Sequence, residues 1–307
     1  MPRPALGRGT RARRLWQFLA VLVALVSSLV VHATTEDEPD PTSGSASTSG
    51  SAQDPWTLLW SDDFEGDAGT PPNGEYWSHE IGGSGWGNEE LQYYTDSADN
   101  AALDGEGHLV ITAREVDPAT TDLKCWYGPC TVTSARLITA GKQKFTYGRI
   151  ESRVKVPAGS GSWPALWMLG ADFGEVGWPQ TGEIDIMEFV GREPDQVFGT
   201  IHGPGYAGGE SFNGFLDIGR PVAEDWHEFT VEWSPQKIVW AVDGAAFHQA
   251  SPTDVAPHEW VFDHPFFLLA NLAVGGNFGG ALAADVVFPV SFTIDHVRVY
   301  RASGDPS

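Results

Sequence analysis

The sequence predicts an all-β domain, a jelly-roll sandwich of two antiparallel sheets. Two observations carry this prediction. Short apolar or alternating runs recur along the chain between turn residues, which include 36 Gly and 21 Pro. No stretch keeps a 3.6-residue hydrophobic period over ten residues, so long helices are not expected. Hydrophobic residues make up 41% of the 307 residues, enough for a large core.

The expected strands follow the chain in order, from the alternating or continuously apolar runs. Residues 148–156 alternate polar and apolar, as a half-buried strand does. Phe266–Val274 is a continuous apolar run suited to a central strand. A Ser-Pro turn and an Asp-Gly turn join three further runs into a meander. The remaining expected strands are 108–113, 229–233, 238–242, 245–248 and 292–300.

Residues 1–33 have the pattern of a secretion signal. A basic segment ends at Arg13-Arg14, an apolar run follows, and Ala33 suits the last position before a cleavage site. A membrane anchor is the alternative, although the run of about 17 residues is at the short limit for spanning. The arginine pair also resembles a twin-arginine signal, so both the Sec route and the twin-arginine route of export remain open.

Residues 34–54 are rich in Ser, Thr, Gly, Pro and acids, which predicts a disordered linker. One globular domain is expected at 55–302, followed by a tail at 303–307. The formal charge of −23 becomes about −28 without the five arginines of the signal. So acidic a protein repels nucleic acid and anionic lipid. We expect a secreted monomer that does not associate with membranes once its signal is cleaved.

Cys125 and Cys130 are the two cysteines of the chain. In an exported protein, cysteines this close are expected to form one small-loop disulfide. Two ligands are too few for a structural zinc site.

The most informative stretch is 182–189, GEIDIMEF. Side chains alternate between the faces of a strand, so Glu183 and Asp185 share one face. Glu188 falls on the other face unless one extra residue, a β-bulge at Ile186 or Met187, returns it. The bulge would gather three carboxyls on one surface.

Clustered carboxyls raise one another's pKa, and glycoside cleavage needs one ionised nucleophile beside one protonated acid. With the bulge absorbing one residue, Glu183 and Glu188 are about four strand spacings apart, roughly 13 Å along the backbone at about 3.3 Å per residue. Long side chains can close this to the roughly 5–5.5 Å of retaining enzymes. The spacing permits this geometry, and a solvated acidic strand face or a metal site remain alternatives.

GEIDIMEFVG, with WPALWMLG before it, resembles the laminarinases and endo-β-1,3-glucanases of glycoside hydrolase family sixteen. The resemblance covers roughly residues 56–301, and the ExDxxE spacing is similar to the laminarinase branch rather than the lichenase branch. Further matching segments are WGNEELQYYT at 86–95, GRIESRVKVP at 148–157, GTIHGPG at 199–205, NLAVGGN at 271–277 and IDHVRVY at 294–300.

The resemblance implies a glycan groove on the concave face of the sandwich. It implies Glu183 as nucleophile, Asp185 as its electrostatic and hydrogen-bonding helper, and Glu188 as general acid and base. The substrate class is then a β-1,3-glucan polysaccharide, with no cofactor for catalysis.

The resemblance also implies substrate-binding residues around these carboxyls. Tryptophans suit the apolar faces of pyranose rings, although Trp167 could equally belong to the core. Arg136 could instead form a surface salt bridge, and a lone histidine is usually structural. The expected substrate-binding residues are Asn88, Arg136, Trp163, Trp167, Trp178 and His202.

Two features of the resemblance are weaker. Phe278 stands where the family often has Trp after GGN, which puts the affinity of one subsite in doubt. Asp295, with carbonyl oxygens near Asp63 and Gly107, resembles the family's calcium site on the convex face, because Ca²⁺ takes oxygen ligands. An ordinary surface Asp295 is the alternative.

The functional hypothesis is therefore a secreted retaining endo-β-1,3-glucanase. The alternatives are a mixed-linkage β-1,3-1,4-glucanase or another polysaccharide hydrolase of the family. A non-catalytic β-glucan-binding protein is disfavoured, because all three acids are present.

Overall fold

The computed structural model describes residues 55–284 and 286–303. They belong to one compact unit that spans Ala52–Ser307. The expected signal at 1–33, the expected linker at 34–54, and residues 304–307 of the expected tail lie outside the described residues. Within the described ranges, no helix is long and apolar enough to cross a membrane.

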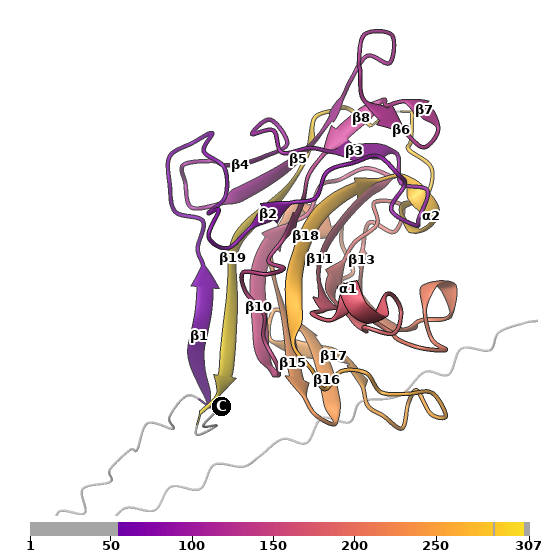
Figure 1. The fold of residues 1–307 in the computed structure, drawn as a ribbon. Coiled ribbons are helices and arrows are strands. Elements are labelled where there is room, and N and C mark those ends of the chain that lie inside the picture. Colours follow the sequence, from indigo (N-terminus) through magenta and orange to yellow (C-terminus); the bar gives the residue numbers. More distant parts are fainter. Residues whose placement is uncertain (1–54, 285, 304–307) are drawn as a thin grey trace, which may run out of the picture. The chain divides into compact units, whose positions relative to one another are not determined.

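The larger of the two main sheets has ten strands (Figure 1). Its order is β17-β16-β15-β10-β19-β5-β8-β3, with β1 also paired to β19 and β4 to β5. The pairs are antiparallel except for β3 and β8, which run parallel and which the sequence pattern did not predict. Its strands are β1 (Trp56–Asp62), β3 (Gln92–Tyr94), β4 (Ala101–Leu103), β5 (Leu109–Glu115), β8 (Val132–Ser134), β10 (Gly148–Lys155), β15 (His227–Ser234), β16 (Lys237–Val242), β17 (Ala245–Ala250) and β19 (Val290–Ala302).

The smaller main sheet has the order β14-β13-β12-β11-β18-β9-β2 and is antiparallel throughout. Its strands are β2 (Ser78–His79), β9 (Arg136–Ile138), β11 (Ser162–Gly170), β12 (Glu183–Glu188), β13 (Gln196–His202), β14 (Phe212–Asp217) and β18 (Phe266–Val274). A two-stranded hairpin, β6 (Lys124–Cys125) and β7 (Gly128–Pro129), carries the Cys125–Cys130 disulfide, as expected. Helical turns are α1 (Phe173–Val176), α2 (Gly276–Gly279), η1 (Gly208–Glu210) and η2 (Val222–Glu224).

The all-β prediction is confirmed, and every expected strand is present. Phe266–Val274 has the bounds that its apolar run predicts, and all nine of its residues are buried. The last strand is longer than expected, because β19 pairs with β1, β5 and β10 along its length. Among the described residues, α-helices are limited to two four-residue turns and 3₁₀ helices to two three-residue turns, in agreement with the absent 3.6-residue period.

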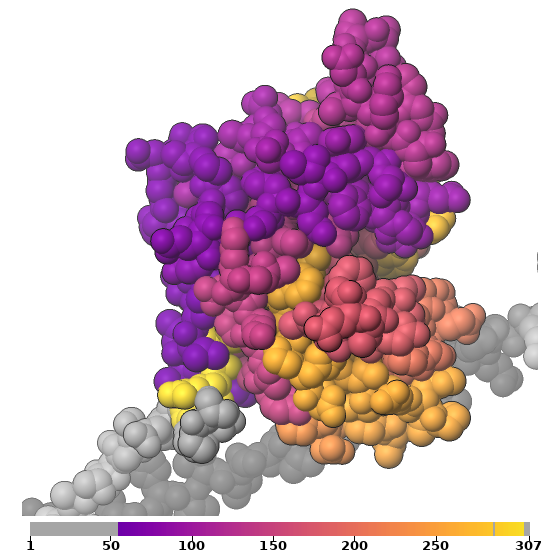
Figure 2. Space-filling model, in the orientation of Figure 1, coloured from indigo at the N-terminus to yellow at the C-terminus, as the bar shows by residue number. Residues whose placement is uncertain are grey.

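The core lies between the two main sheets. Alternation in β10 turns Ile150 and Val154 into this core and leaves Arg149 and Arg153 on the outer face of the larger sheet. The other face of the smaller sheet carries the carboxyls of β12. In Figure 2 the gold surface of the β18–α2 region lies at the base of a hollow, between the indigo N-terminal segments and the red region around α1.

Candidate active site

The bulge expected in the central motif is present. In the pairing of β12 with β13, Asp185 faces Thr200 and Glu188 faces Phe198, so Ile186 and Met187 together oppose the single residue Gly199. The pairing with β11 shifts at the same point. The extra residue returns Glu188 to the face that already carries Glu183 and Asp185.

A residue of the larger sheet supports the bulge from the core side. Trp240 of β16 is fully buried, and its indole N–H donates a 2.7 Å hydrogen bond to the carbonyl oxygen of Asp185. Gly199 leaves room for this indole, because a Cβ at position 199 would lie 2.5 Å from the Trp240 ring. The ring therefore occupies the space that a side chain on β13 would fill, and it fixes the backbone at the bend.

Glu183 contacts two aromatic side chains at the open side of the site. The indole N–H of Trp178 donates a 2.8 Å hydrogen bond to Glu183 Oε2. His202 Nδ1 accepts from the backbone N–H of Gly208, so Nε2 carries the hydrogen of the neutral ring. That Nε2 lies 3.7 Å from Glu183 Oε1 and 3.2 Å from Asp185 Oδ2.

Asp185 is the most enclosed of the three acids, with 3% of its surface exposed. A side-chain hydrogen bond joins it to Glu183, which requires a proton on one of the two. Burial, and then the charge of Glu188, raise the pKa of Asp185 well above its usual range. The hydrogen bond with Glu183 acts in the opposite direction and favours the ionised form of Asp185. The helper role expected for Asp185 stays a prediction.

Glu188 is also buried, at 9% exposure. The indole N–H of Trp163 donates to its Oε1 at 3.0 Å, and the hydroxyl of Thr200 donates to Oε2 at 3.4 Å. Burial raises the pKa of Glu188, whereas His202 and these two donors oppose the rise. A raised pKa favours the protonated form of the carboxyl, which is the form that a general acid needs.

Burial also raises the pKa of Glu183, to about 8, with a further contribution from the charge of Asp185. His202 and the Trp178 hydrogen bond act in the opposite direction and favour the ionised form. Burial thus raises the pKa of both glutamates, while each accepts a hydrogen bond from its own indole, Trp178 for Glu183 and Trp163 for Glu188, which favours the ionised form.

Arg136 lies between two indole rings. Its guanidinium carbon is 4.7 Å from the ring centroid of Trp86 and 4.8 Å from that of Trp167. It also forms an ion pair with Glu80 while its side chain is only 13% exposed. Arg136 therefore forms a salt bridge and is fixed in place by stacking and by charge, whereas its contact with substrate stays a prediction.

Hydrogen bonds connect Trp167 to the loop that carries Asn88. Trp167 donates to Asn271, Asn271 donates to the hydroxyl of Tyr94, and Tyr94 donates to Glu90 at 3.0 Å. The Asn88 amide donates to the other oxygen of Glu90 at 3.3 Å. Burial raises the pKa of Glu90. Trp167 is partly buried and belongs to this network as much as to the core.

Of the residues expected to hold calcium, Asp295 lies in the larger sheet, and Asp63 and Gly107 lie in loops next to strands of that sheet. Asp295 of β19 accepts a hydrogen bond from Arg153 Nη1 at 2.9 Å. Asp63 follows β1 and pairs with Arg298 at 2.6 Å. A Cβ at Gly107 would lie 4.0 Å from the carbonyl oxygen of Asp63, so these two residues are neighbours. The calcium site itself stays a prediction.

Thr200, Trp240 and Gly199 are site residues that the sequence reasoning did not identify. Thr200 could have been predicted from the sequence, because it stands two residues before His202 in a strand and so shares the same face. Trp240 lies 55 residues from Asp185 in the chain, and no local pattern marks such a contact between sheets.

Two buried carboxyls on one sheet face, each with its own indole donor, define a glycoside hydrolase of the two-carboxylate kind. Residues 88–285 match the family described as Glycosyl hydrolases family 16. The chain is 42% identical over 257 residues to a beta-glucanase of Rhodothermus marinus, covering 80% of this chain and 85% of that protein. It belongs to glycosyl hydrolase family 16.

Further similarities agree with this assignment. The chain is 36% identical over 242 residues to a glucan endo-1,3-beta-glucosidase of Cryptopygus antarcticus, covering 73% of this chain and 83% of that protein. The structure of the laminarinase catalytic domain from Thermotoga maritima superposes with a TM-score of 0.75 at 44% identity, covering 82% of this chain and all of that one. Hydrolysis in this family needs no catalytic cofactor, because the carboxyls supply the chemistry.

Proposed function

We propose that the protein is a retaining endo-β-1,3-glucanase. The observation that carries the proposal is the bulge at Ile186-Met187, which brings Glu183 and Glu188 to one face of β12 in different hydrogen-bonding environments. The relatives described above are named as β-glucanases, endo-1,3-β-glucosidases and laminarinases, which supports β-1,3-glucan as the substrate class.

In the first step, Glu188 protonates the glycosidic oxygen while the Glu183 carboxylate attacks the anomeric carbon. The leaving chain departs with the Glu188 proton, and a glycosyl ester forms on Glu183. In the second step, Glu188 takes a proton from water, which attacks the same carbon and releases Glu183. Two inversions at one carbon retain the configuration of the substrate.

The first experiment is a time course on laminarin, lichenan, agarose and cellulose, with chromatography of the products. We expect mixed oligosaccharides early from laminarin, slower cleavage of lichenan at or beside its β-1,3 bonds, and no cleavage of cellulose. The physical reason is that a β-1,3 chain curves whereas a β-1,4 chain is straight. Preference for agarose or cellulose, or release of glucose alone, would contradict the substrate while leaving the catalytic pair intact.

The second experiment follows the anomeric configuration of fresh products by NMR. Retention is expected, because direct attack by Glu183 requires the short carboxyl separation of retaining enzymes. An inverted product would mean that water attacks first and that Glu183 is not the nucleophile.

A structural calcium ion at Asp295 is part of the proposal. Both side-chain contacts described for Asp295 use Oδ2, which leaves Oδ1 for a cation. The carbonyl oxygens near Asp63 and Gly107, two neighbouring residues, are the further ligands proposed. Calcium should raise the melting temperature without changing the chemistry, because an ion that binds the folded state stabilises it. A melting temperature that EGTA leaves unchanged would argue against the site.

Secretion of a monomer is proposed from the N-terminal sequence and the acidic composition. The mature chain should begin near Thr34, and the intact mass of secreted material tests this. A mass that includes residues 1–33 would contradict cleavage.

A further inference from the structure

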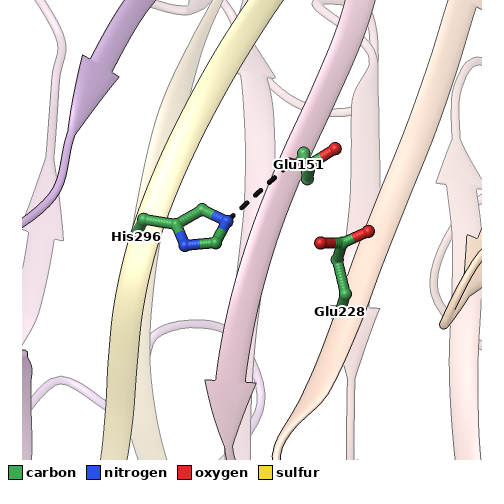
Figure 3. A group of neighbouring side chains, drawn as sticks. All are labelled: Glu151, Glu228 and His296. Atoms are coloured by element: carbon green, nitrogen blue, oxygen red, sulfur yellow. Dashed lines mark ion pairs between the residues drawn. The ribbon is translucent and has the colours of Figure 1, made fainter.

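Three side chains converge on the outer face of the larger sheet. Glu151 of β10 stands in the middle strand, with His296 of β19 on one side and Glu228 of β15 on the other (Figure 3). One ligating atom from each lies within 4.8 Å of the other two. The catalytic carboxyls belong to the other sheet, so this cluster takes no part in glycoside cleavage.

His296 is the unusual member of the cluster. It is 6% exposed, and its Nε2 has no hydrogen-bond partner although it lies 3.8 Å from Glu151 Oε1. Its Nδ1 lies 3.4 Å from Asp295 Oδ2. When Nδ1 carries the hydrogen toward Asp295, the lone pair of Nε2 faces a carboxylate oxygen. In this tautomer two electron-rich atoms face each other, and a cation bound between them would remove the repulsion.

The orientation of His296 matches that of a metal ligand. Histidines that bind metals commonly donate the hydrogen of the second ring nitrogen to a carboxylate, which fixes the ring. Asp295 stands in that position here. Leaving a buried nitrogen unpaired is costly, so a ligand for Nε2 has a clear physical advantage.

The two glutamates offer oxygen atoms on the same side. Arg149 donates to Glu151 Oε2 at 2.6 Å, which leaves Oε1 toward His296, with the Tyr300 hydroxyl 3.4 Å away. The Glu228 side chain is 36% exposed, so it can rotate and water can reach the cluster. Arg149 lies 4.0 Å from Glu228 and offsets part of the negative charge.

We propose that Glu151, Glu228 and His296 form a binding site for a divalent transition metal of the zinc type, with water as the fourth ligand. One imidazole with two carboxylates suits Zn²⁺, whereas Ca²⁺ takes oxygen ligands alone. At metal–ligand distances of about 2.0–2.2 Å, neighbouring ligands are about 3.5 Å apart. The 3.8 Å contact of His296 with Glu151 is nearly this short, and Glu228 needs only a side-chain rotation. The ion joins three adjacent strands and is independent of the substrate.

The test is calorimetric titration of the tag-free full protein with ZnCl₂, together with thermal melting. We expect one zinc site whose filling raises the melting temperature, and a cobalt form with visible d–d absorption. His296→Gln should abolish the absorption and weaken zinc binding at least about 100-fold, and Glu228→Gln at least about 10-fold. Cleavage of laminarin by His296→Gln should stay within about twofold of the wild type.

His202→Gln is the matched control, because Glu183, Asp185 and His202 form the other candidate ligand cluster among the described residues. This variant should bind zinc as the wild type does. Absence of zinc binding in the wild type, undiminished binding in His296→Gln, or loss of binding in His202→Gln would each overturn the proposal. Hydrolysis of laminarin is measured separately, so its failure leaves this result unaffected.

Discussion

Trp178→Phe separates two roles of Trp178, stacking on the sugar and hydrogen bonding to the nucleophile. Phenylalanine keeps an aromatic face but removes the N–H that donates to Glu183 at 2.8 Å. This donor favours the ionised form of Glu183 and so lowers its pKa. Without the donor, the pKa of Glu183 rises further. The rate, which needs the carboxylate, should then be lost at a higher pH as the solution is acidified.

The size of the shift follows from the hydrogen bond. A bond to a charged group contributes about 1.5–3 kcal/mol, but the Trp178 side chain is 45% exposed and water can replace part of it. About 1 kcal/mol remains, which corresponds to about 0.7 pH unit at 1.36 kcal/mol per unit.

The assay is kcat/KM on laminarin as a function of pH, which reports the pKa values of the free enzyme. The acid limb should move up by roughly 0.7 unit while the alkaline limb, assigned to Glu188, stays in place. Trp126→Phe is the matched control, because Trp126 is 50% exposed and its indole donates a 2.8 Å bond to the carbonyl of Glu90. An acid limb that is unmoved, or displaced downward, refutes the reasoning. A uniform fall at every pH would mean that Trp178 acts only by stacking.

Two further predictions concern the carboxyls and their support. Glu183→Gln and Glu188→Gln should each lower kcat by several orders of magnitude with an unchanged circular dichroism spectrum, and near-normal turnover in either variant would remove it from the mechanism. Trp240→Phe should cost about 2 kcal/mol of stability, since the carbonyl of Asp185 loses its donor, and should lower kcat with little change in KM. Trp233→Phe is the control for Trp240→Phe, because its buried indole donates to the carbonyl of Phe262, away from the bulge. Equal losses of kcat in both variants would deny Trp240 a positioning role.

The sequence predicts local features of this protein well. Alternation and continuous apolar runs identified the strands, since these patterns reflect which face of a strand is buried. The bulge was also predictable, because Glu188 shares a face with Glu183 only if one residue is extra. The parallel pairing of β3 with β8 was not predictable, because it joins short segments that carry little pattern of their own.

Contacts between distant segments account for what the sequence did not predict at the site. Trp163 was expected to stack on sugar, and its indole bond to Glu188 depends on how β11 and β12 pair. The chain of donors from Trp167 to Glu90 passes through residues of three separate segments. A one-dimensional pattern contains neither relation, since each depends on the final packing of the sheets.

The support that Trp240 gives to Asp185 makes the active site sensitive to how the two layers are aligned. A small slip of one sheet over the other would withdraw the indole and relax the bend, while most strand hydrogen bonds remain. Heat inactivation should therefore begin before secondary structure is lost. Transplanting the GEIDIMEF strand into another sandwich should likewise fail unless its neighbours at positions 199 and 240 are transferred with it.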